Sequence, residues 1–207
     1  MATQVLGVSV MTHPHYMAGY SSKARLPDES KLIEKLPSRV HKLARGNQAA
    51  LDQLRFMYSL HQHYRKTVDE TKARRGAHMI MLTSERELID DTHDMHDLHL
   101  AKIPKDIAKA VLEYGKTLQG ELVSYAAGRL GKRFGAFEAS WEPEVAGRAL
   151  KAYLRRNSLE LHPNAEISVF GEYLGEEECV NDAHKSILAA GFANAKIEAG
   201  KSIKSTP

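Results

Sequence analysis

The sequence predicts an α+β fold: several long helices packed on one face of a small mixed sheet, with a C-terminal β-α-β-like unit. Two long segments carry apolar residues at spacings of three and four, which is the periodicity of an amphipathic helix. Short runs rich in β-branched residues separate these segments, as is typical of strands. The chain has 207 residues, 43% of them hydrophobic, so it can bury a core of its own.

Residues 1–27 are predicted to form a strand and an extended arm. Gln4 to Met11 (QVLGVSVM) is a short β-branched run. The segment that follows it, up to Pro27, contains two prolines and a GYSS stretch, which favour irregular structure. We expect the strand either to complete the sheet or to reach a neighbouring molecule.

Residues 28–157 are predicted to be a mainly helical core. A short helical piece is expected around Leu32 to Leu36, and Pro37 can open the next helix because a first-turn proline loses no helical hydrogen bond. Asn47 can cap a long helix that Gly76 terminates. The apolar stripe of that helix consists of Ala50, Leu54, Met57, His61, Tyr64 and Val68.

A strand over Ala77 to Leu82 and a second long helix over Pro104 to Leu130 continue this core. The second helix has the most regular apolar stripe of the chain. It also contains Gly115, Gly120 and Gly128, each of which costs about 1 kcal/mol relative to alanine in a helix. We therefore expect a neighbouring helix or sheet to approach closely at these glycines.

The rest of the chain is predicted to be shorter elements. A loop is expected over Gly131 to Phe137, followed by a helix that Ser140 caps. Residues 158–200 are predicted to be the β-α-β-like unit, and residues 201–207 a flexible tail. Within that unit the sequence indicates a strand over Glu166–Leu174, a helix over Glu177–Ala190 and a returning strand over Asn194–Ala199.

The stretch DDTHDMHDLHL, residues 90–100, is the strongest indication of chemistry in the sequence. Ser84 and Glu87 match a capping box, which places the stretch on a helix beginning near Glu85. One hypothesis is a divalent metal site; the other is a solvated acidic face near a helix N-terminus, which the helix dipole favours without any metal. The predicted metal ligands are His93, Asp97, Asp90 and Asp94, with His61 from the preceding long helix.

Two short resemblances concern this stretch. His93-Asp94 and His96-Asp97 resemble the HD pair of HD-domain phosphohydrolases, which would imply a metal site completed by a downstream aspartate. The chain has no aspartate between Asp106 and Asp182, where that ligand would be expected. Residues 90–94 also resemble the DDxxD motif of isoprenoid synthases, but no second acidic motif occurs. The chain is assigned to neither family.

Basic residues suggest a nucleic-acid interface. Lys132, Arg133 and Phe134 offer two cations beside an aromatic ring that can stack on a base. The predicted patch also includes Arg155 and Arg156 and can extend to Lys72, Arg74 and Arg75. The alternative is a set of solvated helix ends, since basic residues favour the C-terminal end of a helix.

Charge alternates along the chain, although the formal net charge is only +3. The net values are +7 for residues 1–75, −4 for 76–103, +4 for 104–157 and −4 for 158–207. Blocks of opposite sign suit contacts between copies of this chain or with other protein subunits. With no catalytic motif in the sequence, the first functional hypothesis is a non-enzymatic structural or adaptor subunit that self-associates in a larger assembly, including a virus or phage particle.

Two alternatives remain: a metal-binding protein, including a metal-dependent hydrolase, and a nucleic-acid-binding protein. A divalent metal is the only cofactor that the sequence suggests. No apolar run reaches membrane-spanning length and no signal-peptide pattern occurs, so we expect no membrane partner. The expected location is the cytoplasm, or a particle assembled from cytoplasmic material. The single cysteine, Cys179, excludes a disulfide framework within the chain.

Overall fold

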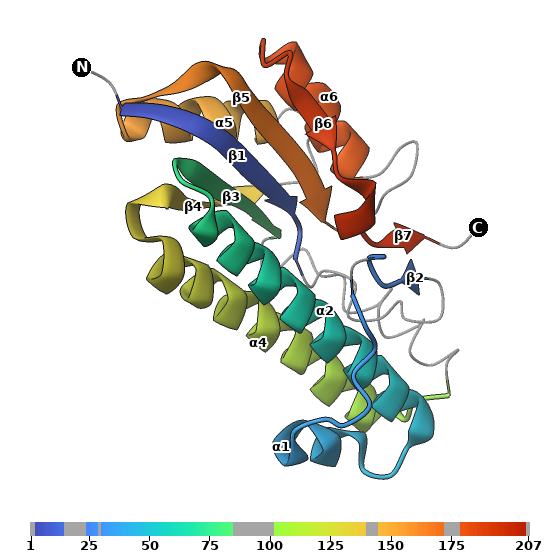
Figure 1. Ribbon diagram of the computed structural model, residues 1–207. Coiled ribbons are helices and arrows are strands. Elements are labelled where there is room, and N and C mark those ends of the chain that lie inside the picture. The colour runs from blue at the N-terminus through green and yellow to red at the C-terminus, as the bar shows by residue number, and fades with distance from the viewer. Residues whose placement is uncertain are drawn as a thin grey trace.

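A computed structural model describes residues 3–14, 24–28, 30–84, 102–139, 145–171 and 179–205. These residues form a five-stranded sheet in the order β4-β3-β1-β5-β6 and a separate ribbon of β2 and β7 (Figure 1). The strands of the sheet are β1 (Thr3–Thr12), β3 (Ala77–Ser84), β4 (Phe134–Ala139), β5 (Leu159–Gly171) and β6 (Ala195–Ile197). The ribbon pairs β2 (Ala24–Arg25) with β7 (Lys204–Ser205) in antiparallel orientation.

The helices connect these strands. They are α1 (Ser38–His41), α2 (Gln48–Ala73), α4 (Lys105–Leu130), α5 (Val145–Arg156) and α6 (Cys179–Ala189), with short 3-10 turns at Lys42–Ala44, Gly131–Arg133 and Ala199–Lys201. Asn47 caps α2 as predicted, because its side-chain oxygen accepts a hydrogen bond of 2.9 Å from the Ala50 amide. None of the helices in the described ranges is both long and apolar enough to cross a membrane.

The α+β class is confirmed, with two differences in detail. The sheet is parallel throughout rather than mixed, because every pair of neighbouring strands in it runs in the same direction. Helices also cover both faces of the sheet, not one. The reason is that parallel neighbours need a crossover connection, and helical crossovers place helices over the faces of the sheet.

The N-terminal strand β1 lies in the centre of the sheet. It pairs with β3 on one side, where Gly7 faces Ala77, and with β5 on the other, where Val8 faces Ile167. The chain thus adds β3 and β4 on one side of β1 before it adds β5 and β6 on the other. This doubly wound order has its switch point between β1 and β5.

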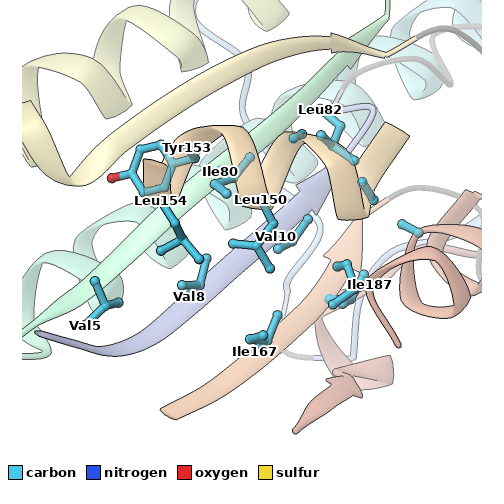
Figure 2. Packing of buried hydrophobic residues seen from close by; sticks show 14 of the residues in the cluster. Val5, Val8, Val10, Ile80, Leu82, Leu150, Tyr153, Leu154, Ile167 and Ile187 are labelled. Atoms are coloured by element: carbon cyan, nitrogen blue, oxygen red, sulfur yellow. The ribbon is translucent and has the colours of Figure 1, made fainter. Parts of the chain in front are cut away.

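One face of the sheet packs against the two short helices, α5 and α6. Figure 2 shows Val8, Val10 and Ile80 on the strands beneath Leu150 and Tyr153 of α5. All of these side chains are at most 2% exposed. Branched aliphatic residues dominate this core, as expected where parallel strands are buried.

The other face packs against the two long helices, α2 and α4. Met11, Met79 and Met81 of the strands meet Leu60 of α2 and Leu122 of α4 in this core. A further cluster joins the N-terminal halves of α2 and α4 to the α1 region and contains no strand residue. Its fully buried members include Ala50, Leu54, Val111 and Leu118.

Two local predictions are wrong. Phe134 to Ala139 is the edge strand β4, although a loop was expected up to Phe137. The piece around Leu32 to Leu36 is not helical but irregular, with a bend at Glu34 and Lys35. The C-terminal β-α-β-like unit is confirmed, since α6 connects the parallel neighbours β5 and β6. The predicted capping side chain of Ser84 and the whole of Ser140 lie outside the described part of the chain.

The three glycines of α4 differ in how closely other residues pack against them. Gly115 is buried, as expected for a close approach between packed elements. Gly120 and Gly128 face open space, because a Cβ atom added at either position would meet no atom within 4 Å. Packing among the described residues therefore does not account for these two glycines.

Candidate functional site

The predicted metal site is described only in part. His93, Asp97, Asp90 and Asp94 lie outside the described residues. His61 lies on α2, where its side chain is 2% exposed and its Nε2 atom is 4.0 Å from Glu121 Oε2. Within the described part of the chain, no group of three or more histidine, cysteine, aspartate or glutamate side chains is arranged to hold a metal ion. The metal hypothesis stays a prediction.

His61 instead belongs to a groove between α2 and α4. Burial, with a smaller contribution from the positive charge of Arg65, lowers the pKa of His61 to about 4. The ring also stacks near Tyr58, with 6.5 Å between ring centroids. His61 is therefore a neutral hydrogen-bonding group at pH 7.

The α2–α4 groove has a volume of ≈ 540 Å³ and opens on the outer surface of the helix pair. It is lined by His61, Arg65, Gly120, Glu121, Ser124 and Tyr125. Gly120 leaves this part of α4 without a side chain, which helps to hollow the surface. The groove has the volume of a site for a small organic group.

Four side chains beside the groove form a connected network. Arg65 lies over the Tyr125 ring, with its Cζ atom 4.1 Å from the ring centroid. The Tyr125 hydroxyl donates a 2.8 Å hydrogen bond to Asp69, and Arg129 Nε donates another of 2.8 Å. Burial acts to raise the pKa of Asp69, but these hydrogen bonds outweigh it and lower the pKa below its usual value. Asp69 stays ionised and fixes the Tyr125 ring.

Arg133 has a structural role at the C-terminal end of α2. Its Nη1 atom donates to the carbonyls of Arg74 and Ala77, at 3.2 and 3.3 Å, and its Nη2 atom donates to that of Lys72 at 3.2 Å. These carbonyls include ones that a helix end leaves without an internal partner. Arg133 therefore ties the turn after α4 to the end of α2.

This tie brings basic side chains from distant parts of the sequence to one edge of the sheet. The edge is the amino-terminal one, where β3, β4 and β5 begin and where α2, α4 and α5 end. On the α5 side, the Tyr153 hydroxyl donates to the Lys132 carbonyl at 3.2 Å. We call the exposed basic residues found there the basic edge: Lys72, Arg74, Arg75, Lys132, Arg155 and Arg156.

The cations of the basic edge make no direct ion pair with the described carboxylates, although the charge of Arg74 is close enough to help lower the pKa of Glu198. Within the described part of the chain, no carboxylate oxygen lies within 4.0 Å of any of its six cationic groups. By contrast, Arg129 and Lys201 nearby are paired with Asp69 and Glu198. Lys132 and Arg133 thus lie beside the basic residues at the end of α2, and their role in binding nucleic acid stays a prediction.

Phe134 is not available as a stacking platform. It begins β4, where it pairs with Met79, and its ring is partly buried against the core between the sheet and the long helices. The aromatic ring that the structure does bring beside basic groups is Tyr125. No local pattern predicts this pairing, because Arg65 and Tyr125 lie on different helices about 60 residues apart.

The carboxyl edge of the sheet is the opposite end of the molecule. At the switch point, Gly171 approaches β1 so closely that a Cβ atom there would lie 2.3 Å from the Thr12 carbonyl oxygen. His13 follows with a left-handed backbone (φ 43°), and burial lowers the pKa of its imidazole to about 4. The segments after β1 and β5, residues 15–23 and 172–178, lie outside the described residues, so the structure shows no site there.

Comparison of the chain with family models, with curated proteins and with solved structures found no match. The function has to be argued from the residues above.

Proposed function

We propose that the protein binds nucleic acid through phosphate contacts on the basic edge. The observation that carries this proposal is the convergence of six exposed cations from three helix ends, without a described carboxylate within 4.0 Å. Clustering of basic charge on one surface is the electrostatic footprint of a nucleic-acid-binding protein. The alternating charge blocks of the sequence do not oppose it, because folding gathers cations from two of those blocks.

The basic edge has dimensions that suit several phosphates. In the register of the sheet, β5 begins opposite Thr3 of β1 and β3 begins opposite Gly7. At roughly 3.3 Å per residue, these two strand starts are staggered by about 13 Å along β1. Cations spread over such a slanted edge can each meet a different phosphate, and each contact releases counterions.

Fluorescence anisotropy with a labelled mixed-sequence DNA strand, measured over a range of salt concentrations, tests the proposal. The test variant replaces Lys132, Arg155 and Arg156 by alanine and leaves Arg133, which holds the helix ends, in place. We expect binding to weaken by about tenfold or more at moderate salt. The slope of log K against log salt should fall by roughly 2, about 0.7 for each lost contact with a single strand.

The matched control removes the same charge at the far ends of the helices. Lys42, Lys105 and Lys109 are exposed and lie near the start of α2 and α4. Their triple alanine variant should keep the salt slope of the wild type. If both triple variants lose affinity equally, the attraction is a net-charge effect and the proposal is wrong. It is also wrong if the wild-type affinity does not depend on salt.

The structural or adaptor role in a self-associating assembly stays a prediction. Its discriminating measurement is native mass spectrometry of the untagged protein, because one spectrum reports subunit number and bound metal. A metal-free homo-oligomer would favour the assembly role. A stoichiometric metal that is lost on His93→Ala would favour the metal site.

A further inference from the structure

We infer that the α2–α4 groove holds one unpaired nucleobase of a single strand whose phosphates lie on the basic edge. This inference rests on the proposed function and makes it more specific, because it names single-stranded nucleic acid as the ligand. Sequence-tolerant binding of single strands needs a basic track for the backbone and flat groups on which bases stack. The groove supplies the flat group.

The flat group is the guanidinium of Arg65. The Tyr125 ring supports one side of it at 4.1 Å, and the Tyr125 hydroxyl is held in turn by Asp69. Among the residues that the structure describes, Arg65 makes no hydrogen bond and no carboxylate contact within 4.0 Å. Its side chain is therefore held over the Tyr125 ring and by the charge of nearby Asp69, without a direct ion pair. Unpaired bases in single strands stack on guanidinium planes.

The opposite wall of the groove offers hydrogen-bonding groups for the edge of a base. Glu121 is 43% exposed and meets Arg39 and His61 only at 3.8 and 4.0 Å, so its oxygens can accept from an amino or imino group. Ser124 is exposed one turn further along α4. The charges around the groove are those of Arg39, Arg65, Arg129, Asp69 and Glu121, which leave it slightly positive.

The groove and the basic edge are close enough for one strand to occupy both. Arg65 and Arg74 are nine residues apart along α2 and its C-terminal end, which corresponds to about 13 Å of helix. Tyr125 and Lys132 are seven residues apart on α4 and the turn after it. The volume of ≈ 540 Å³ is within the range of sites for small organic ligands, so one base fits.

The test compares a fluorescein-labelled mixed-sequence DNA strand with the same strand annealed to its complement. We expect the wild type to bind the single strand about fivefold or more tightly, since stacking of a base contributes roughly 1–3 kcal/mol. Arg65→Lys keeps the charge but removes the planar group, and Gly120→Leu fills the groove without changing any charge. Both variants should lose the preference for the single strand and keep the wild-type salt slope.

Arg45→Lys is the control, because it makes the same change at the far end of α2, where Arg45 pairs with Asp106. It should behave as the wild type. If Arg65→Lys and Gly120→Leu, shown by their circular dichroism to be folded, keep the preference, the inference is wrong. Equal wild-type affinity for the two probes also overturns it, and the proposed function then still stands on the basic-edge variants. If neither probe binds, both fail.

Discussion

The two faces of the sheet are built for different tasks. On one face, α5 and α6, of 12 and 11 residues, cover the strands with aliphatic side chains, and the end of α5 adds Arg155 and Arg156 to the basic edge. On the other face, α2 and α4 each have 26 residues, about 39 Å of helix, and continue past the sheet to a cluster of their own (Figure 1). The groove lies on this second pair, and the basic edge includes its C-terminal ends.

The long helices α2 and α4 extend further than is needed to cover the sheet. Their N-terminal halves pack on each other and on the α1 region, through residues such as Leu54 and Val111, and touch no strand in that cluster. Their outer surface has a groove, open glycines and a stacked Arg65–Tyr125 pair. We therefore assign the groove to α2 and α4, and the basic edge to the C-terminal ends of α2, α4 and α5.

Leucine truncations give the largest expected effects. Leu150 on α5 and Leu54 on α2 are both 0% exposed, so each change to alanine should lower the free energy of unfolding by about 3 kcal/mol. Hydrogen exchange should distinguish them. Leu150→Ala is expected to loosen the strand amides, and Leu54→Ala only the N-terminal halves of α2 and α4. Identical exchange patterns would contradict two separable packing regions.

Gly147 on α5 tests how tightly the short helices pack. A Cβ atom at this position would lie 2.5 Å from the Ser186 carbonyl oxygen and 2.8 Å from Ala190 Cβ. Gly147→Ala should therefore force α5 and α6 apart and cost about 2 kcal/mol, measured by denaturant unfolding. An unchanged midpoint would mean that the contact between α5 and α6 is looser than the structure shows.

His61 makes the long-helix face sensitive to acid. Its pKa is about 4 in the folded chain against 6.5 ordinarily, so below pH 6.5 the unfolded chain binds a proton that the folded chain does not. Stability is thus lost as the pH falls from 6.5 towards 4, by about 2 kcal/mol at pH 5. His61→Gln should lose less stability between pH 7 and pH 5 than the wild type, measured by urea unfolding. Equal losses would show that His61 titrates normally.

Gly120→Ala is expected to have the smallest effect and the opposite sign to Gly147→Ala. The new methyl group would meet no atom within 4 Å, and alanine favours the helix by about 1 kcal/mol. The melting temperature should therefore rise by a few degrees. A fall would mean that the surface of α4 around Gly120 is already covered in the free protein.

Local signals predicted the long helices well. The stripe from Ala50 to Val68 is buried on α2, and the cap at Asn47 depends only on a neighbour three residues away. Strand β4 was missed because it is a short, half-exposed edge strand with a glycine in it, and its partner β3 lies some 50 residues earlier. The parallel order of the sheet depends on such distant pairings throughout.

In the candidate site, too, some features could be predicted from the sequence and others depend on contacts between distant residues. The sequence predicts Lys132, Arg155 and Arg156 as members of a basic patch but does not show that they lie together. The fold places them on one edge of the sheet, because the helices end where the parallel strands begin. Two other properties follow only from tertiary contacts. These are the structural role of Arg133 and the stacking of Arg65 on Tyr125.

The most direct measurement is hydrogen exchange of the wild-type protein with and without the labelled single strand. Because exchange is read along the chain, it locates the ligand rather than merely detecting it. We predict slower exchange around residues 72–77, 131–134 and 155–159, where the basic edge lies, and along the groove-lining turns of α2 and α4. Protection confined to the ends of β1 and β5 would contradict the account, because it would place the ligand at the opposite edge of the sheet.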